Sequence, residues 1–344
     1  MKTITGLSNN LQTNIDQFTM VFKSEDSTNW KEKCLTFRDD ILQTFFNNFE
    51  YFEYGDLSSY SNVITIKVYS HDVKIGFNDD WSNNGICIYF TSQGSKLLEQ
   101  ELNIRPYTLF QELYKIGLKH NLEGHYSRCD IAVDFINQDI IVNDLFRKIA
   151  RHTITVVDYR NRRNNSKFEN HGNNGIDNTV YIGSSGKPRL RIYNKKKQQQ
   201  DLKGPYLSLA NSVNTWVRFE YEVRLHYGKV LSKKMLDIRD DIQYNSLLLQ
   251  TMTDRYRFVQ NGKYLPYTRM MLNGIESSTP VIFAPKTRLH TDLDKRKDWV
   301  RSNTTGFTNV LKDVNRVEGT KEVANVLKEL LMISGIEGID ITIK

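Results

Sequence analysis

Three segments of the chain alternate between charged and apolar residues, and this pattern limits the possible folds more than any other feature. They read RCDIAVDF (128–135), RLRIYNK (189–195) and RFEYEVR (218–224). Side chains two positions apart on a strand point to the same face of a sheet. Each segment is therefore predicted to form a strand with one apolar and one ionic face, in a sheet that buries its apolar side.

The ionic faces carry carboxylates, cations and one tyrosine. They comprise Arg128, Asp130 and Asp134, then Arg189, Arg191, Tyr193 and Lys195, and finally Arg218, Glu220, Glu222 and Arg224. If the strands are neighbours, these groups converge on one surface. Carboxylate oxygens such as those of Asp130 and Glu220 suit Mg²⁺ or Mn²⁺, and a tyrosine hydroxyl can be a nucleophile if its pKa of about 10 is lowered. The alternative is an ordinary solvent-exposed face, with cross-strand Arg/Glu pairs and a tyrosine that only packs against its neighbours.

The remaining pattern predicts an α+β fold, with an antiparallel sheet catalytic domain, flanking helices and a mainly helical C-terminal region. Further strands are expected at 61–70, 84–92, 153–159 and 179–183, the last forming a hairpin with 189–194 through SSGKP. Helices are expected at 107–118, at 142–152 with Asn143 as N-cap, at 235–259 and at 320–333. Residues 160–178 are expected to form a loop. The predicted domains are 1–232, with core motifs in 83–227, and 233–344.

The charge of the chain favours a polyanionic partner. The formal net charge is +7 over 344 residues, and basic residues concentrate in 147–203 and 286–316. The three cysteines, Cys34, Cys87 and Cys129, are too widely spaced for a zinc motif and are expected to be buried free thiols in a reducing cytoplasm. No segment approaches the roughly 20 apolar residues of a membrane span, so no membrane partner is expected.

The same motifs resemble those of the Rep_trans family, the rolling-circle replication initiators of staphylococcal-type and related plasmids. SRCDIAVDF resembles the family's Arg-x-Asp-(Leu/Ile)-Ala-x-Asp-Phe strand, and VRFEYEVR resembles its Arg-(Val/Phe)-Glu strand. YIGSSGKPRLRIYNKKKQ resembles its Tyr-x-Gly…Arg-Ile-Tyr-Asn-Lys-Lys segment. The resemblance covers roughly residues 83–227, and the first eighty and last hundred residues match less clearly.

The resemblance implies that Tyr193 cuts one DNA strand at an origin. The tyrosine becomes joined to the 5′ phosphate, and the freed 3′ hydroxyl primes synthesis. Asp130 and Glu220 are implied metal ligands for Mg²⁺ or Mn²⁺, with Asp134 as a third candidate. The partners implied are plasmid or mobile-element origin DNA, both duplex and single strand, a host helicase and a second copy of the chain.

Cations beside these motifs are expected to hold DNA. Near the scissile bond, the candidates for phosphate contacts are Arg189, Arg191, Lys195, Lys196 and Arg218. Origin recognition is expected in 233–344, where Lys295, Arg296 and Lys297 lie in a mixed-charge segment. No two histidines are two positions apart, but His125 and His226 flank the carboxylate motifs and could contact a metal or act as a base.

Two other functions remain open at this point. A conjugative relaxase of a mobile element uses the same chemistry and would carry the same residues. A non-catalytic DNA-binding protein would use the basic hairpin of residues 179–194 only to bind phosphates. The second alternative predicts that the Tyr193 hydroxyl is dispensable.

Overall fold

A computed structural model of the chain describes residues 10–68, 71–81, 84–164, 168–171, 179–276, 311, 315–317 and 322–327. The chain divides into two compact units, Met1–Phe283 and Ala284–Lys344. The sheets and labelled helices below all belong to the first unit. The described residues of the second unit are helical.

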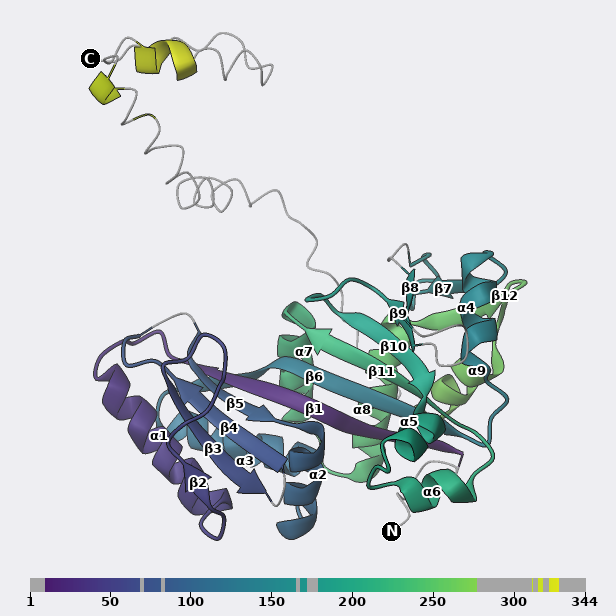
Figure 1. Cartoon of the computed structure of the whole chain (residues 1–344), viewed down its shortest axis with the longest axis horizontal. Coiled ribbons are helices and arrows are strands. Elements are labelled where there is room, and N and C mark those ends of the chain that lie inside the picture. Colours follow the sequence, from purple (N-terminus) through teal and green to yellow (C-terminus); the bar gives the residue numbers. More distant parts are fainter. Residues whose placement is uncertain are drawn as a thin grey trace. The chain divides into compact units, whose positions relative to one another are not determined.

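A large antiparallel sheet forms the centre of the first unit (Figure 1). Its strand order in the described chain is β2 (Tyr51–Phe52), β3 (Asn62–Val68), β4 (His71–Phe77), β5 (Ile86–Phe90), β1 (Leu11–Lys23), β6 (Glu123–Ile136), β11 (Trp216–Arg224), β10 (Arg189–Asn194), β9 (Thr179–Ile182) and β8 (Phe168–His171). A smaller sheet has the order β13 (Lys263–Tyr264), β12 (Arg257–Gln260) and β7 (Thr155–Val157). The long strands β1 and β6 pair along nearly their whole length and form the spine of the unit.

Helices flank the sheet. They are α1 (Trp30–Phe45), α2 (Ser92–Glu101), α3 (Pro106–Lys119), α4 (Val142–Ala150), α5 (Lys195–Asp201), α6 (Leu207–Ser212), α7 (His226–Met235), α8 (Asp241–Arg255) and α9 (Pro266–Asn273). In Figure 1, α7, α8 and α9 lie behind β6 and β11, while α5 and α6 lie in front of the ends of these strands. One face of the central sheet is thus covered by helices, and much of the other is left for polar groups.

The apolar face that the sequence predicted is the face that packs against these helices. On β6, residues Cys129, Ile131, Val133 and Phe135 are all buried, as are Phe219, Tyr221 and Val223 on β11. The rings of Phe135 and Phe219 meet with centroids 4.9 Å apart. The predicted fold class, an antiparallel sheet with flanking helices, is confirmed.

Several local predictions need correction. Helix α4 has Ile141 at its N-cap, without a side-chain cap, so Asn143 is not the capping residue. The predicted loop 160–178 contains β8, an edge strand held by its pairing with β9 rather than by apolar content. The predicted helix 235–259 ends at Arg255 as α8, and its last residues form β12 instead.

The first unit extends past residue 232, where the sequence predicted its end. Helix α8 packs on the sheet, and a buried hydrogen bond from Thr13 Oγ1 to Asn245 Oδ1, 2.7 Å long, ties it to β1. Lys295, Arg296 and Lys297 lie outside the described residues. Within the described part of the chain, the helices are all too short or too polar to cross a membrane.

Close packing of α7 on β6 gives a stability prediction. A Cβ atom at Gly228 would lie 2.3 Å from the carbonyl oxygen of Tyr126, and backbone cannot yield as a flexible side chain can. We expect Gly228→Ala to lower the free energy of unfolding by about 1–3 kcal/mol, measured by urea denaturation. Lys229→Ala, at an exposed position of the same helix, should change it little, and equal stabilities of the two variants would contradict this packing.

Candidate active site

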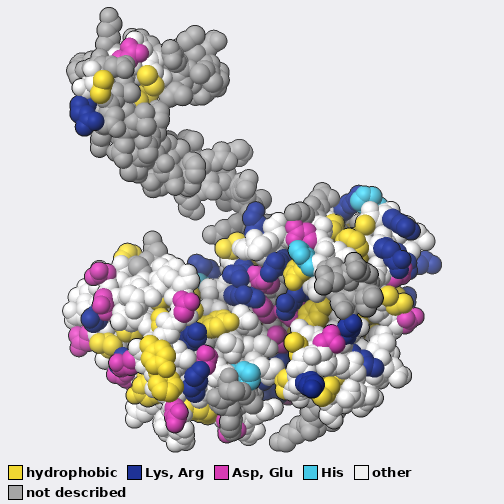
Figure 2. All heavy atoms as spheres, in the orientation of Figure 1, with side chains coloured by type: hydrophobic (Ala, Val, Ile, Leu, Met, Phe, Trp, Pro, Cys, Tyr) yellow, Lys and Arg dark blue, Asp and Glu magenta, His cyan; other side chains and the backbone are white. Residues whose placement is uncertain are grey.

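Strand pairing brings the three ionic faces together in register, as the sequence predicted. Strand β11 lies between β10 and β6, and opposing residues form three rows across the sheet. The rows are Tyr193, Arg218 and Asp134, then Arg191, Glu220 and Ala132, and then Arg189, Glu222 and Asp130. Figure 2 shows basic and acidic side chains gathered in a hollow over these strands.

Tyr193 lies near the end of β10 with its side chain almost enclosed. The residue is 6% exposed, and its hydroxyl donates a hydrogen bond of 2.9 Å to Glu220 Oε2. The Arg191 guanidinium and the Lys195 ammonium face its ring, 5.0 and 5.7 Å from the centroid. Burial, and then the charge of Glu220, raise the pKa of Tyr193 well above its ordinary value. The hydroxyl is therefore protonated in this state, with a carboxylate placed to accept its proton.

Arg218 is enclosed by carboxylates and is 1% exposed. Its Nε and Nη2 atoms donate to the two oxygens of Asp134, each at 2.7 Å, and its Nη1 donates to Asp16 Oδ1 at 2.5 Å. The sequence predicted a phosphate contact for this residue. Because its donors are directed to buried carboxylates, Arg218 is placed to fix the strands next to Tyr193 rather than to face solvent.

The lysines that follow Tyr193 differ in their surroundings. Lys195 is buried at 7% exposure, and its Nζ donates to Gln198 Oε1 at 2.7 Å. Burial, followed by the charge of Arg218, lowers the pKa of Lys195 to about 8. Lys196 donates to the carbonyl oxygen of Val213 at 2.9 Å. Lys195 thus belongs to the surroundings of the tyrosine rather than to the open surface.

Arg189 and Arg191 are the accessible cations of the site. Their side chains are 27% and 37% exposed, and they pair with Glu222 and Glu220 respectively. Both guanidinium groups lie at the rim of the tyrosine site and are partly exposed to solvent. They are therefore the best placed of the predicted phosphate contacts.

Asp130 lies two rows away from Tyr193 and is 2% exposed. Arg128 donates to both of its oxygens, at 2.9 Å from Nε and 2.6 Å from Nη2. Burial raises the pKa of Asp130 to about 6, against the lowering by Arg128 and with smaller contributions from Glu220 and Glu222. These neighbouring carboxylates therefore repel one another in the absence of further positive charge.

The chemistry of this donor set fits a hard divalent cation. Asp130, Glu220 and Glu222 present oxygen atoms on one face, and an ion between them would relieve their repulsion. Each carboxylate is paired with arginine in this conformation. Accordingly, no three His, Cys, Asp or Glu side chains of the described residues are grouped to hold a metal. Both Asp130 and Asp134 have an arginine on their two oxygens, but Asp134 is the weaker candidate because its partner Arg218 is fully buried, whereas Arg128 is 29% exposed.

The two flanking histidines lie apart from this cluster. His125 lines a cavity at the start of β6 with Lys23 and Lys229. Burial and these two lysines lower the pKa of His125 to about 4. His226 is the first residue of α7. The surroundings of His125, with two cations close by, are unlike those of a metal ligand grouped with carboxylates.

Two residues of the site were missed by the sequence analysis. Asp16, on β1, binds Arg218 and also Lys96 of α2, the latter at 3.1 Å. The register between β1 and β6 shifts at Asp16, between Ile15 and Gln17. This bulge interrupts the two-residue period by which the other strands were found. A lone acid within a strand whose one other charged residue is the terminal Lys23 was the available signal.

Comparison with known proteins gives the family. The model of the replication initiation factors, Rep_trans, matches residues 124–327, more than half of the chain and a span that includes Asp130, Tyr193 and Glu220. The chain belongs to this family. No curated protein matches it.

A solved structure shows the same fold. It is the rolling circle replication initiator protein from Geobacillus stearothermophilus, with a TM-score of 0.52 and 19% sequence identity. The match covers 77% of this chain and 95% of the other. The sheet and helices described above are thus the fold of a known initiator, and the family resemblance seen in the sequence is confirmed.

The raised pKa of Asp130 gives a pH prediction. The unfolded side chain ionises near pH 4 and the folded one at about 6, so the folded state binds the proton more tightly and stability falls as pH rises from about 4 to 6. The Asp130→Asn variant has no carboxyl group at this position, so its stability does not fall for this reason. We expect its free energy of unfolding, relative to wild type, to rise by about 1–3 kcal/mol between pH 4 and 7.5, measured by urea denaturation. A difference that is constant with pH would show that Asp130 ionises normally.

Proposed function

We propose that the protein starts rolling-circle replication by nicking one strand of its origin with Tyr193. The observation that carries the proposal is the hydrogen bond from the Tyr193 hydroxyl to Glu220 of the adjacent row, among the cations and carboxylates of the ionic face of the sheet. Membership in the replication initiation factors supports the initiator role. The same membership favours replication over conjugative transfer by a relaxase.

The reaction follows from these positions. The Tyr193 oxygen attacks the scissile phosphorus while Glu220 accepts the phenolic proton. A bond forms between this oxygen and phosphorus, the bond from phosphorus to the 3′ oxygen breaks, and the departing oxygen takes up a proton from water. The 5′ phosphate remains on the tyrosine and the 3′ hydroxyl is free to prime synthesis. One phosphodiester replaces another, so no ATP is required and reversal rejoins the strand.

The charges around Tyr193 suit this step. Arg191 and Lys195 lie over the ring, where they stabilise the negative charge that develops on the phenolic oxygen. Arg189 and Arg191 are exposed enough to bind phosphate oxygens of the strand. The pairing of β10 with β11 sets Glu220 against the tyrosine, and Arg218 holds β11 on β6 through Asp134.

A divalent cation, Mg²⁺ or Mn²⁺, is proposed to bind near Asp130 and Glu220. When bound it would supply positive charge to the phosphate oxygens. Origin contacts by Lys295, Arg296 and Lys297 remain a proposal for the C-terminal region, as do the host helicase and a homodimer.

Removal of one oxygen atom tests the nucleophile. Tyr193→Phe keeps the ring beneath Arg191 and Lys195 and loses only the hydroxyl, so we expect no covalent adduct on supercoiled origin DNA with Mg²⁺, while DNA binding is kept. Adducts are counted on denaturing gels and binding by mobility shift. Tyr181→Phe, on the neighbouring strand β9, is the matched control and should form the adduct normally. An adduct with Tyr193→Phe would assign the nucleophile elsewhere.

Metal titration tests the carboxylates. Asp130→Asn is expected to raise the Mg²⁺ concentration for half-maximal nicking by about tenfold or more, because a carboxylate ligand is lost. Glu220→Gln loses both a ligand and the proton acceptor, so it should fail at any Mg²⁺ concentration. Binding of Mn²⁺, followed by electron paramagnetic resonance, should weaken in both. Glu112→Gln on α3, paired with Lys115, is the control, and unchanged titrations in all three variants would remove Asp130 and Glu220 as ligands.

A further inference from the structure

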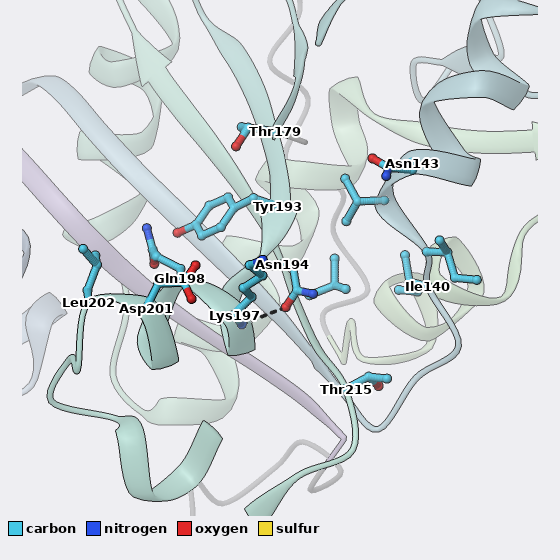
Figure 3. Close-up of a pocket in the computed structure, with 13 residues that line it drawn as sticks. Ile140, Asn143, Thr179, Tyr193, Asn194, Lys197, Gln198, Asp201, Leu202 and Thr215 are labelled. Atoms are coloured by element: carbon cyan, nitrogen blue, oxygen red, sulfur yellow. Dashed lines mark hydrogen bonds between the residues drawn. The ribbon is translucent and has the colours of Figure 1, made fainter. Parts of the chain in front are cut away.

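A cavity of about 500 Å³ opens directly beside Tyr193. Figure 3 shows it between α5, which carries Gln198 and Asp201, and the segment at Ile140 and Asn143 that leads into α4. Tyr193 itself lines the cavity. A ligand that fills the cavity therefore lies beside the proposed nucleophile.

The nucleophile and one wall of the cavity are positioned by a single turn of the chain. Strand β10 ends at Asn194 and α5 begins at Lys195. The Asn194 side chain accepts a hydrogen bond of 3.0 Å from the backbone nitrogen of Lys197, which fixes the start of the helix (Figure 3). A second bond, from Lys195 to Gln198, braces the same turn.

The walls of the cavity are largely aliphatic. Ile140, Val142 and Val217 contribute to them. Ile141 and Leu202 also line it, although they are 63% and 71% exposed. Leu202 follows the last turn of α5 and Ile141 precedes α4, so each end of the cavity has an exposed apolar side chain. A flat apolar ligand placed against Leu202 would remove it from water.

The polar groups of the cavity are mostly uncharged. They are Asn143, Asn194, Gln198, Thr179 and Thr215, together with the carboxylate of Asp201 and the ammonium of Lys197. The phosphate-facing rim of the site, by contrast, is built from arginines. Amides and a carboxylate read the donors and acceptors of a base edge, whereas aliphatic walls cover its faces.

We propose that this cavity holds one unpaired nucleobase of the nicked strand, from a nucleotide next to the scissile phosphate. Leu202 covers the base, while Gln198 and Asp201, from the same helix α5, bind its edge. The proposal rests on the proposed function and deepens it, because it adds a site where sequence at the nick is read. The Asp201 carboxylate accepts from an exocyclic amino group, which favours adenine, cytosine or guanine over thymine.

Abasic substitution tests the site. Single-stranded oligonucleotides carrying the mapped nick sequence are made with an abasic residue at each of the positions around the nick in turn, and adduct formation is measured as kcat/KM. For wild type we expect a loss of about tenfold or more at one position, where stacking and edge contacts are removed. On the intact substrate, the double variant Asp201→Ala, Leu202→Ala should show a similar loss of kcat/KM. An abasic residue at the sensitive position should then cause no further loss in this variant.

Gln200→Ala is the matched control, since Gln200 is exposed on α5 but does not line the cavity. It should keep the wild-type profile. A second readout is independent of cleavage: 2-aminopurine, placed at each position of an origin oligonucleotide in turn, should change fluorescence at one position on binding to Tyr193→Phe, and not when the two cavity substitutions are added. An identical abasic profile in wild type and double variant would overturn the proposed base site. So would an identical fluorescence change in Tyr193→Phe with and without the cavity substitutions. Failure of wild type to form any adduct would instead overturn the proposed function, with the fluorescence arm still deciding on the cavity.

Discussion

A buried arginine holds the central strands in register. Arg218 on β11 binds Asp134 on β6 and Asp16 on β1, and it is among the largest fully buried side chains. Removing one partner of such a group leaves an uncompensated buried charge, at a cost of about 3–5 kcal/mol. A slip of one residue in either pairing would turn these charges toward the apolar face. The geometry of the tyrosine site therefore follows from the neutralisation of this one guanidinium group.

In the proposed reaction, the same arrangement would keep the tyrosine unreactive until DNA binds. Tyr193 is protonated and bound to Glu220, which also receives the Arg191 guanidinium. A phosphate that draws Arg191 toward itself leaves Glu220 with fewer hydrogen-bond donors, so the carboxylate is free to take the phenolic proton. Under the proposed function, substrate binding and activation of the nucleophile would be coupled through Arg191, which lies between Tyr193 and Arg189 on β10.

The two-residue period was enough to place the site but not to show what is buried. It assigned Tyr193, Glu220 and Asp130 to one face, and the pairing of β10, β11 and β6 confirmed their convergence. The pattern gives the face of a strand and not what covers that face, so the enclosure of Arg218 could not be predicted. Lys195 begins α5 after the strand has ended, and the helix, rather than the strand period, sets its position.

The contribution of β1 shows why the family motifs alone do not make the site. The family match begins at residue 124, yet β1 lies between β5 and β6 in the middle of the sheet. Without β1, Arg218 would lose Asp16, and β6 would present a row of unpaired backbone groups along its edge. Lys96 of α2 would lose its partner Asp16 as well. The first hundred residues are thus structural partners of the tyrosine site, because they supply the strand that neutralises the arginine on which its register depends.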